Sequence, residues 1–324
     1  MTSIIGTYGL NLFCISLFVS PAIFILRDSS KDIGVCIFFF ITTAFFYVYG
    51  SSYKDSFYKA SKENYTYKIR AIGSNINIER FYKNIDSVSI IKDLIKISDP
   101  KLKEKTIFVW PEGILPDISQ EELIQYSSLF NKKFNKNHLI IIGNNSKSLK
   151  NGKNDYFNSF SLYDHKLNLL DSYNKINLVP FGEFLPLENI LGRIGLKSLT
   201  NNYQSFTKGE RRDIIEIKQE NFLLKVLPLI CYEIIFSGKL FDNSDFDLII
   251  NISEDGWFGK SIGPRQHLAH SIFRAIESGK YVVRSANNGI AAIINPLGEV
   301  EQSVIFGQSG YVDLTKNSKI QPTI

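Results

Sequence analysis

The sequence is poor in the residues that build cross-linked or metal-centred domains. It contains only three cysteines and four histidines among 324 residues. The cysteines, at positions 14, 36 and 231, lie far apart, which excludes a disulfide framework and a cysteine-based zinc site. His267 and His270 are one helical turn apart, but no acidic or cysteine residue lies near them at ligand spacing. We therefore expect neither a bound metal nor another cofactor.

The sequence also lacks a large excess of either charge. There are 37 lysines and arginines against 32 acidic residues, a net charge of +5. Because the lysines are spread along the chain rather than clustered, we expect no nucleic-acid partner. Apolar residues make up 44% of the chain and charged residues 21%, which indicates a folded protein with a substantial core.

Charge is almost absent from the first fifty residues. No charged side chain occurs in residues 1–26, and a second uncharged run covers residues 33–53. Nineteen helical residues extend about 28 Å at roughly 1.5 Å per residue, which is close to the thickness of a bilayer's hydrocarbon core. A short polar turn, residues 27–32, separates the two runs. The pattern predicts a transmembrane helical hairpin at residues 1–53.

Two other interpretations of these runs remain open. A signal peptide would begin with a basic segment, and the sequence begins MTSIIG. Two buried helices of a soluble fold would be unusually long for segments without charge. The flanking charges orient the hairpin poorly, because two basic residues lie in the turn and five follow the second run by residue 70. The positive-inside rule alone would place the rest of the chain in the cytoplasm.

From residue 65 onward, short β-rich runs alternate with helical, lysine-rich stretches, which predicts one α/β domain over residues 65–318. Strands are expected at residues 106–109, 139–142, 160–163, 222–230, 248–252, 281–284 and 290–294. Helices are expected at residues 85–97, 120–135 and 266–278. The long and weakly patterned segment 185–209 is expected to cross over a site. Its apolar part, residues 185–199, is expected either to form a lid facing lipid or to pack as an ordinary loop.

Three reactive side chains follow apolar strands at their ends: Glu112, Lys175 and Cys231. Each alone has an ordinary explanation, as a capping carboxylate, a solvated lysine and a small buried thiol. Together they form a coherent set for acyl transfer. A carboxylate can take the proton of the thiol, the thiolate can attack a carbonyl carbon, and an ammonium can stabilise the oxyanion that forms.

Longer motifs surround these residues. They occur in the order WPE at 110–112, YNKINLVPFGEFLP at 173–186, CYE at 231–233 and NISEDGWFG at 251–259. These motifs resemble those of the nitrilase superfamily of carbon-nitrogen hydrolases. The segment 178–186 and the segment 251–267, which ends in GPRQH, resemble in particular its apolipoprotein N-acyltransferase branch. RAIE at 274–277 and RSANNGI at 284–290 extend the resemblance, which covers roughly residues 70–315.

The resemblance implies a fold and a role for individual residues. The fold is an α-β-β-α sandwich of the nitrilase type, preceded by the transmembrane hairpin. Glu112 is the expected general base, Lys175 the stabiliser of the tetrahedral intermediate and Cys231 the nucleophile. Further site residues, expected to bind substrate, are Glu183, Tyr232, Glu233 and Trp257.

The implied reaction is a ping-pong acyl transfer in the bacterial inner membrane, with the catalytic domain facing the periplasm. The thiol takes an acyl chain from a phospholipid as a thioester, and the N-terminal diacylglyceryl-cysteine amine of an apolipoprotein accepts it. Family members carry more membrane helices than the two found here, so a separate chain supplying the missing helices is a further expected partner. They also have a Lys-Trp pair after the first strand of the domain, where this chain offers Tyr82 and no tryptophan.

Two alternatives to the acyltransferase remain open. The first is a membrane-tethered amidase or nitrile hydrolase that uses the same three residues with water as acceptor. The second is a non-catalytic remnant that keeps the fold and does not bind lipid.

Overall fold

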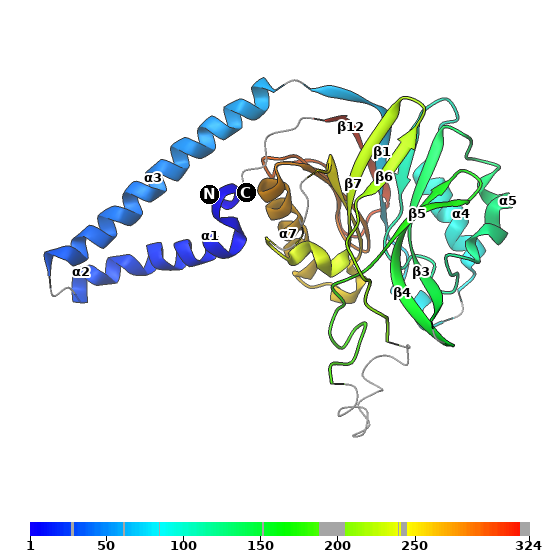
Figure 1. Ribbon diagram of the computed structural model, residues 1–324, viewed down its shortest axis with the longest axis horizontal. Helices are drawn as coiled ribbons and strands as arrows, with labels where there is room; N and C mark the ends of the chain where they lie inside the picture. The colour runs from blue at the N-terminus through cyan, green and yellow to red at the C-terminus, as the bar shows by residue number, and fades with distance from the viewer. Residues whose placement is uncertain are drawn as a thin grey trace.

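The computed structural model describes residues 1–26, 29–60, 62–83, 85–150, 152–187, 205–238, 240 and 245–317 (Figure 1). The α-helices are α1 (Thr2–Val19), α2 (Ile23–Leu26), α3 (Ser30–Lys59), α4 (Ser87–Ser98), α5 (Ser127–Phe130) and α7 (Gly263–Ser278). Short 3₁₀ helices are η1 (Ser20–Ala22), η2 (Ile78–Phe81), η3 (Leu123–Tyr126), η6 (Cys231–Ile235) and η7 (Asp255–Phe258). The first six strands are β1 (Glu63–Ser74), β2 (Thr106–Val109), β3 (His138–Lys150), β4 (Lys153–Asp164), β5 (Leu169–Asn174) and β6 (Ile215–Gln219). The remaining strands are β7 (Phe222–Ile230), β8 (Leu248–Glu254), β9 (Tyr281–Asn287), β10 (Ala291–Ile294), β11 (Val300–Val304) and β12 (Gly310–Asn317).

All the strands belong to one folded sheet with two halves. Its main path runs β5-β4-β3-β2-β1-β9-β8-β7-β6, while β12 pairs with β1, and β10 pairs with β9 and β11. The central pairs β1–β2, β2–β3, β7–β8 and β8–β9 are parallel, and the outer pairs β3–β4, β4–β5 and β6–β7 are antiparallel. A short parallel pairing of β1 with β9 joins the halves. Because all these parallel strands run in one direction, the strands of both halves end at the same edge of the folded sheet.

The fold has four layers, helices, two halves of the sheet and helices again, and an apolar cluster fills each of the three spaces between them. The inner cluster lies between the two halves of the sheet and contains side chains such as Val109, Ile141 and Val226. A second cluster fills the space between the first half and helices α4 and α5. A third lies between the other half and α7. In Figure 1, α4 and α5 cover one outer face and α7 covers the opposite one. The predicted α-β-β-α sandwich is confirmed.

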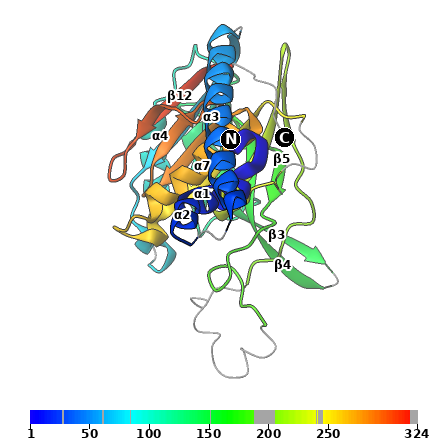
Figure 2. The ribbon, with the colours of Figure 1, turned by 90° about the vertical axis from the view of Figure 1, so that its left-hand side faces the viewer.

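The hairpin helices reach away from this sandwich. They meet near α2 and diverge toward the domain, where α1 lies against α7 and α3 leads into β1 (Figures 1 and 2). Segments Thr2–Ala22 and Lys31–Lys59 are long and apolar enough to cross a membrane, and only 17% and 6% of their apolar windows are buried. The ring of Phe13 contacts those of Phe39 and Phe46, which holds the helices together.

The first helix is anchored to α7 by a buried polar cluster. Gly6 has a φ of +65°, which kinks α1 and turns the next residue toward α7. The Thr7 backbone N–H and hydroxyl both donate to Glu277 Oε1 at 2.7 Å, and Arg274 donates to the Thr7 hydroxyl at 2.6 Å. Ser237, just after η6, also donates to Glu277 at 2.7 Å. The hairpin thus contacts the elements that follow Cys231.

The expected strands are all present, and several are longer than predicted. The helix expected at 120–135 is wrong, because that stretch contains only η3 and α5. Its buried apolar side chains, Leu123, Phe130 and Phe134, anchor short turns in the second apolar cluster. Most of the predicted crossing segment and lid, residues 188–204, lies outside the described residues.

Candidate active site

Cys231 lies at the corner between β7 and η6. Strand β7 ends at Ile230, and Cys231 begins the next helix with a φ of +48°. A left-handed conformation costs a residue with a side chain roughly 1–2 kcal/mol, so the surrounding structure must hold it. The sharp strand-to-helix turn presents the side chain at the end of the sheet. The prediction that the thiol directly follows an apolar strand is confirmed.

Glu112 lies at the end of β2, in the other half of the sandwich. Its Oε1 accepts from the Asn158 side chain at 2.7 Å and from the Lys175 ammonium at 3.2 Å. Its Oε2 accepts from the backbone N–H of Glu254 at 3.0 Å. The carboxylate is buried, and each oxygen has a defined partner. Its orientation is therefore fixed before a substrate arrives.

Lys175 follows β5 directly and is only 1% exposed. Its backbone N–H donates to the Asn158 carbonyl at 2.9 Å, which places Lys175 beside the middle of β4. Its ammonium lies 3.2 Å from Glu112 and 2.9 Å from Glu183. A buried lysine that contacts two carboxylates remains charged, because each carboxylate favours the ammonium form.

Glu183 is returned to this lysine by a tight loop. Its backbone N–H donates to the Val179 carbonyl at 2.9 Å, and its Oε2 accepts from the Val179 N–H at 2.8 Å. Phe181 takes a φ of +62° within the turn. The side chain of Asn158 donates to Glu183 at 2.8 Å as well as to Glu112, so one amide links both carboxylates. The motif VPFGEF thus forms a tight loop that holds the Glu183 carboxylate next to Lys175.

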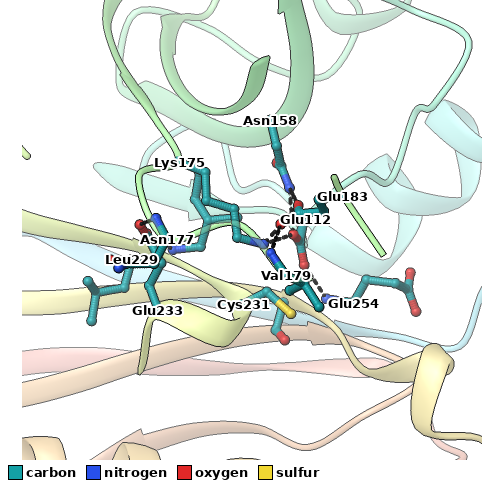
Figure 3. Close-up of polar contacts among 12 residues, drawn as sticks. Glu112, Asn158, Lys175, Asn177, Val179, Glu183, Leu229, Cys231, Glu233 and Glu254 are labelled. Atoms are coloured by element: carbon teal, nitrogen blue, oxygen red, sulfur yellow. Dashed lines mark hydrogen bonds and ion pairs between the residues drawn. The ribbon is translucent and has the colours of Figure 1, made fainter. Parts of the chain in front are cut away.

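The three predicted catalytic side chains are brought together. In Figure 3, Glu112, Lys175 and Glu183 converge on one side of Cys231, whose sulfur lies beside them. Burial alone would lower the pKa of Lys175, but Glu112 and Glu183 raise it well above its usual value. Burial raises the pKa of the Cys231 thiol, Glu112 raises it further, and Lys175 opposes the rise. The thiol is therefore protonated at rest, and a base must take its proton during attack.

Glu233, two residues after the thiol, is fully buried and binds main-chain groups. Its Oε1 accepts from the N–H groups of Ile176 and Asn177 at 2.9 and 3.1 Å, and its Oε2 accepts from the Ile230 N–H at 2.9 Å. Arg212 also pairs with it at 2.7 Å, and the Tyr173 hydroxyl donates at 2.6 Å. This carboxylate therefore connects the segment after Lys175 to the turn that carries the thiol.

The sequence is similar to a known protein family and to curated proteins that share one name. Residues 105–315 match the family model described as carbon-nitrogen hydrolase. The chain belongs to the carbon-nitrogen hydrolase family. A curated relative from Bradyrhizobium diazoefficiens, named apolipoprotein N-acyltransferase, is 30% identical over 338 aligned positions, which cover 99% of this chain and 61% of the relative. One of the same name from Rickettsia prowazekii is 36% identical over 229 positions, covering 69% of this chain and 44% of that protein.

Solved structures show the same family fold. A CN-hydrolase superfamily protein from Xanthomonas campestris is 15% identical, with a TM-score of 0.52 over 78% of this chain and 90% of that one. A nitrilase-superfamily amidase from Nesterenkonia is 14% identical, with a TM-score of 0.51 over 79% of this chain and 93% of that one. The resemblance to the nitrilase superfamily and its apolipoprotein N-acyltransferase branch is therefore confirmed. The chain spans about three fifths or less of the curated relatives it matches.

Two predicted substrate-binding residues of this carbon-nitrogen hydrolase lie in the short helices that begin at Cys231 and directly after Glu254. Trp257, in η7, is 50% exposed and packs on Phe81, with 5.0 Å between ring centroids. Phe258, next to it, is also exposed. Tyr232 follows the thiol and contacts the Phe236 ring edge-on at 5.4 Å. Substrate binding by Tyr232, Glu233, Glu183 and Trp257 stays a prediction.

Sequence reasoning missed several residues of the site. Asn158 lies on β4 and carries no recognisable motif, yet it bridges the two carboxylates. Glu254 donates its N–H to Glu112, and its own buried carboxylate pairs with Arg80 and accepts from Asn287 at 2.7 Å. Two of them were partly indicated by the sequence, because Glu254 and Asn287 lie within the motifs at 251–259 and 284–290. Their hydrogen-bond partners could be identified only from the fold.

Proposed function

We propose that the chain transfers an acyl chain from a phospholipid to the N-terminal diacylglyceryl-cysteine amine of apolipoproteins, through a thioester on Cys231. The observation that carries the proposal is the Lys175 ammonium held between Glu112 and Glu183 beside a buried thiol. The names of the curated relatives supply the substrate class. The two apolar helices support a site at a bilayer surface.

In the first half-reaction, Glu112 takes the proton of Cys231 as the sulfur attacks the ester carbonyl carbon of the lipid. The resulting oxyanion is stabilised by the Lys175 ammonium. When the tetrahedral intermediate collapses, the carbon–oxygen bond breaks, Glu112 returns the proton to the departing alkoxide, and a lysophospholipid leaves. The acyl chain remains on the sulfur as a thioester.

In the second half-reaction, the α-amine of the lipoprotein attacks the thioester carbonyl. Glu112 accepts a proton from the attacking nitrogen and returns it to the thiolate as the carbon–sulfur bond breaks. The products are an amide and the regenerated thiol. Because Cys231 is buried, little bulk water reaches the thioester. Attack by an amine that is bound at the site is therefore favoured over hydrolysis.

The proposal includes a membrane location. The hairpin would lie in the bacterial inner membrane, with the catalytic domain facing the periplasm, where the acceptor amine is presented. The exposed aromatic residues of η7, Trp257 and Phe258, would face the lipid near the site. Further membrane helices from a separate chain belong to the proposal, since the relatives extend beyond the matched length.

The test is mass spectrometry of the full chain after incubation with phosphatidylethanolamine vesicles. We expect an acyl-sized adduct on Cys231 that hydroxylamine removes, and none in C231A. An added diacylglyceryl-cysteine peptide should discharge the adduct, whereas the same peptide with an acetylated amine should not. Hydrolysis of small amides without an adduct would contradict the proposal and favour the amidase.

Complementation tests the cellular activity and the partner. A cell depleted of its own N-acyltransferase is given this chain alone or with a separate helix bundle. Restored N-acylation in the second case only would support a partner chain. Failure in both cases, with the protein present in the membrane, would favour a non-catalytic remnant.

A further inference from the structure

The carbonyl group of Cys231 has a partner that acyl transfer as described does not use. Nε2 of His267, on α7, lies 3.1 Å from the Cys231 backbone oxygen. A carbonyl oxygen can only accept, so Nε2 carries a proton and donates it. His267 is only 4% exposed, so water does not compete for this contact. The nucleophile turn is thus tied to α7 by its main chain.

The imidazole ring is itself fixed by a buried polar cluster. Its Nδ1 lies 2.9 Å from Asp255 Oδ1 and 3.2 Å from Arg284 Nη2. Arg284 contacts both oxygens of Asp255, at 2.9 and 2.7 Å. The ring of Phe258 packs edge-on against the imidazole at 5.6 Å between centroids. The ring therefore has one orientation.

The cluster stays charged although it is buried. Burial alone would raise the pKa of Asp255, but the guanidinium of Arg284 and the His267 ring lower it well below its usual range. Asp255 and Arg284 are fully buried, so their pairing is not weakened by solvent. A fixed anion on one side of the ring and a carbonyl on the other define where each ring nitrogen lies.

Cys231, His267 and Asp255 are the residue types of a thiol–imidazole–carboxylate triad, but the geometry differs from one. Nε2 is directed to the carbonyl oxygen of Cys231, so this nitrogen is not available to accept the thiol proton. That proton has Glu112 as its acceptor, in the other half of the sheet. The imidazole acts on the main chain of the nucleophile.

The conformation of Cys231 explains what such a contact does. With a φ of +48°, this residue needs its neighbours to hold it against the cost of the left-handed region. On the preceding side, the Ile230 N–H donates to Glu233 at 2.9 Å. On the following side, the carbonyl of Cys231 is held by His267 at 3.1 Å. The two hydrogen bonds bracket the residue whose side chain must meet Glu112 and Lys175.

We propose that His267 is a positioning residue, which keeps Cys231 in its left-handed conformation by donating Nε2–H to the Cys231 carbonyl while Asp255 and Arg284 orient the ring. The inference rests on the proposed function only in taking Cys231 as the nucleophile. It predicts that the reach of the side chain at position 267 matters, and not merely its polarity.

The test compares two carboxamides at this position. The amide of H267Q extends as far as Nε2 and can donate to the Cys231 carbonyl, whereas that of H267N extends only as far as Nδ1. We expect H267N to lower the maximal rate of thioester formation on the order of 100-fold, the effect of a misplacement of about 1 Å. The lipid concentration giving half the maximal rate should not change. H267Q should stay within about tenfold of the unmodified protein.

A second measurement needs no lipid. Alkylation of Cys231 by iodoacetamide should slow in H267N and be restored in H267Q, with unfolding midpoints alike. H270N is the matched control, because His270 lies on the same helix and its buried Nδ1 has no partner among the described residues. If the unmodified protein reacts with iodoacetamide but forms no thioester, the proposed function fails while this comparison still decides the role of His267.

Specific results would overturn the inference. A folded H267N with an unchanged thioester rate and alkylation rate would do so, as would equal losses in H267N and H267Q. A folded H267Q that has lost more than about a hundredfold in rate would do so as well. Should H267N not fold, H267F, which keeps a flat ring without a donor, takes its place with the same expected results.

Discussion

The ammonium of Lys175 lies 3.2 Å from Oε1 of Glu112, so the proposed base and the proposed oxyanion stabiliser are in contact before any substrate binds. The same ammonium lies 2.9 Å from Glu183. One positive charge thus faces two carboxylates, and a thiolate at Cys231 would add a third negative charge. The resting site therefore favours the protonated thiol, and the proposed reaction depends on proton transfer during attack.

The first prediction concerns the acidity of the thiol. Because burial and Glu112 raise the pKa of Cys231 above its usual value, the thiolate fraction should rise about tenfold per pH unit from pH 7 to 9. Iodoacetamide alkylation should follow that slope without a plateau. E112Q removes the negative charge that raises this pKa, so alkylation at pH 8 should become faster while thioester formation from lipid is lost.

The Lys175 variant should show the opposite effect on alkylation. K175M removes the charge that lowers the pKa of Cys231, so alkylation at pH 8 should be slower than in the unmodified protein. A plateau below pH 8 in the unmodified protein would show that the thiol is already ionised. That result would contradict the protonated resting site.

The second prediction separates an architectural role of Glu233 from substrate binding. In E233Q, the buried guanidinium of Arg212 loses its counter-charge, and one N–H group faces an amide NH₂ instead of an oxygen. Breaking a buried ion pair typically costs about 3–5 kcal/mol. We expect a fall of this order in the free energy of unfolding, measured with denaturant in detergent.

The control for Glu233 is E183Q. Glu183 is partly exposed and pairs with Lys175 at the site, so its loss should reduce the thioester rate with a smaller effect on stability. If E233Q were as stable as the unmodified protein and yet inactive, direct contact of Glu233 with substrate would explain the loss better than architecture.

The third prediction concerns the contact of the hairpin with the catalytic domain. The hydroxyl of Thr7 donates to Glu277 and accepts from Arg274 in a buried cluster. T7V keeps the shape of the side chain and removes both hydrogen bonds, which should cost about 1–3 kcal/mol. Thermal unfolding in detergent should show the loss, and protease cleavage between α3 and β1 should become faster.

T43V is the matched control for this substitution. The hydroxyl of Thr43 donates to the Phe39 carbonyl of its own helix at 2.8 Å and is exposed at the surface of α3. Its removal should change the unfolding free energy by less than about 0.5 kcal/mol. Equal effects of T7V and T43V would show that the Thr7 cluster does not anchor the hairpin.

Periodicity predicted most of the central strands because parallel strands buried on both faces read as continuous apolar runs, as in residues 222–230 and 248–252. The central strand β1 was not predicted, because polar and charged residues interrupt its apolar positions. The edge strands β5, β6, β11 and β12 were not predicted either, because none of them contains a long apolar run. The segment 120–135 looked helical by composition, and tertiary contacts of Leu123, Phe130 and Phe134 decided otherwise.

The site was predictable where a side chain follows a strand within a motif, as for Glu112, Lys175 and Cys231. Contacts between distant segments were not. Asp255 lies beside His267 because η7 and the start of α7 are packed together, a contact between residues too far apart in the sequence for spacing to indicate. Spacing along the chain shows which residues share a helical face, whereas this contact depends on how two elements pack.

The last prediction concerns the exposed tryptophan of η7. Trp257 is half exposed and packs on Phe81, in the short helix that directly follows Glu254, so it offers an apolar face to a lipid. W257A should raise the vesicle concentration that gives the half-maximal thioester rate about 5- to 20-fold, from the loss of about 1–2 kcal/mol of aromatic contact. Reaction with a short-chain, water-soluble ester should change little, because that substrate needs no docking to a bilayer. F306A, which removes an exposed aromatic side chain between β11 and β12, serves as the control. Equal losses of W257A with both substrates would place Trp257 in the chemistry or the fold of the site instead.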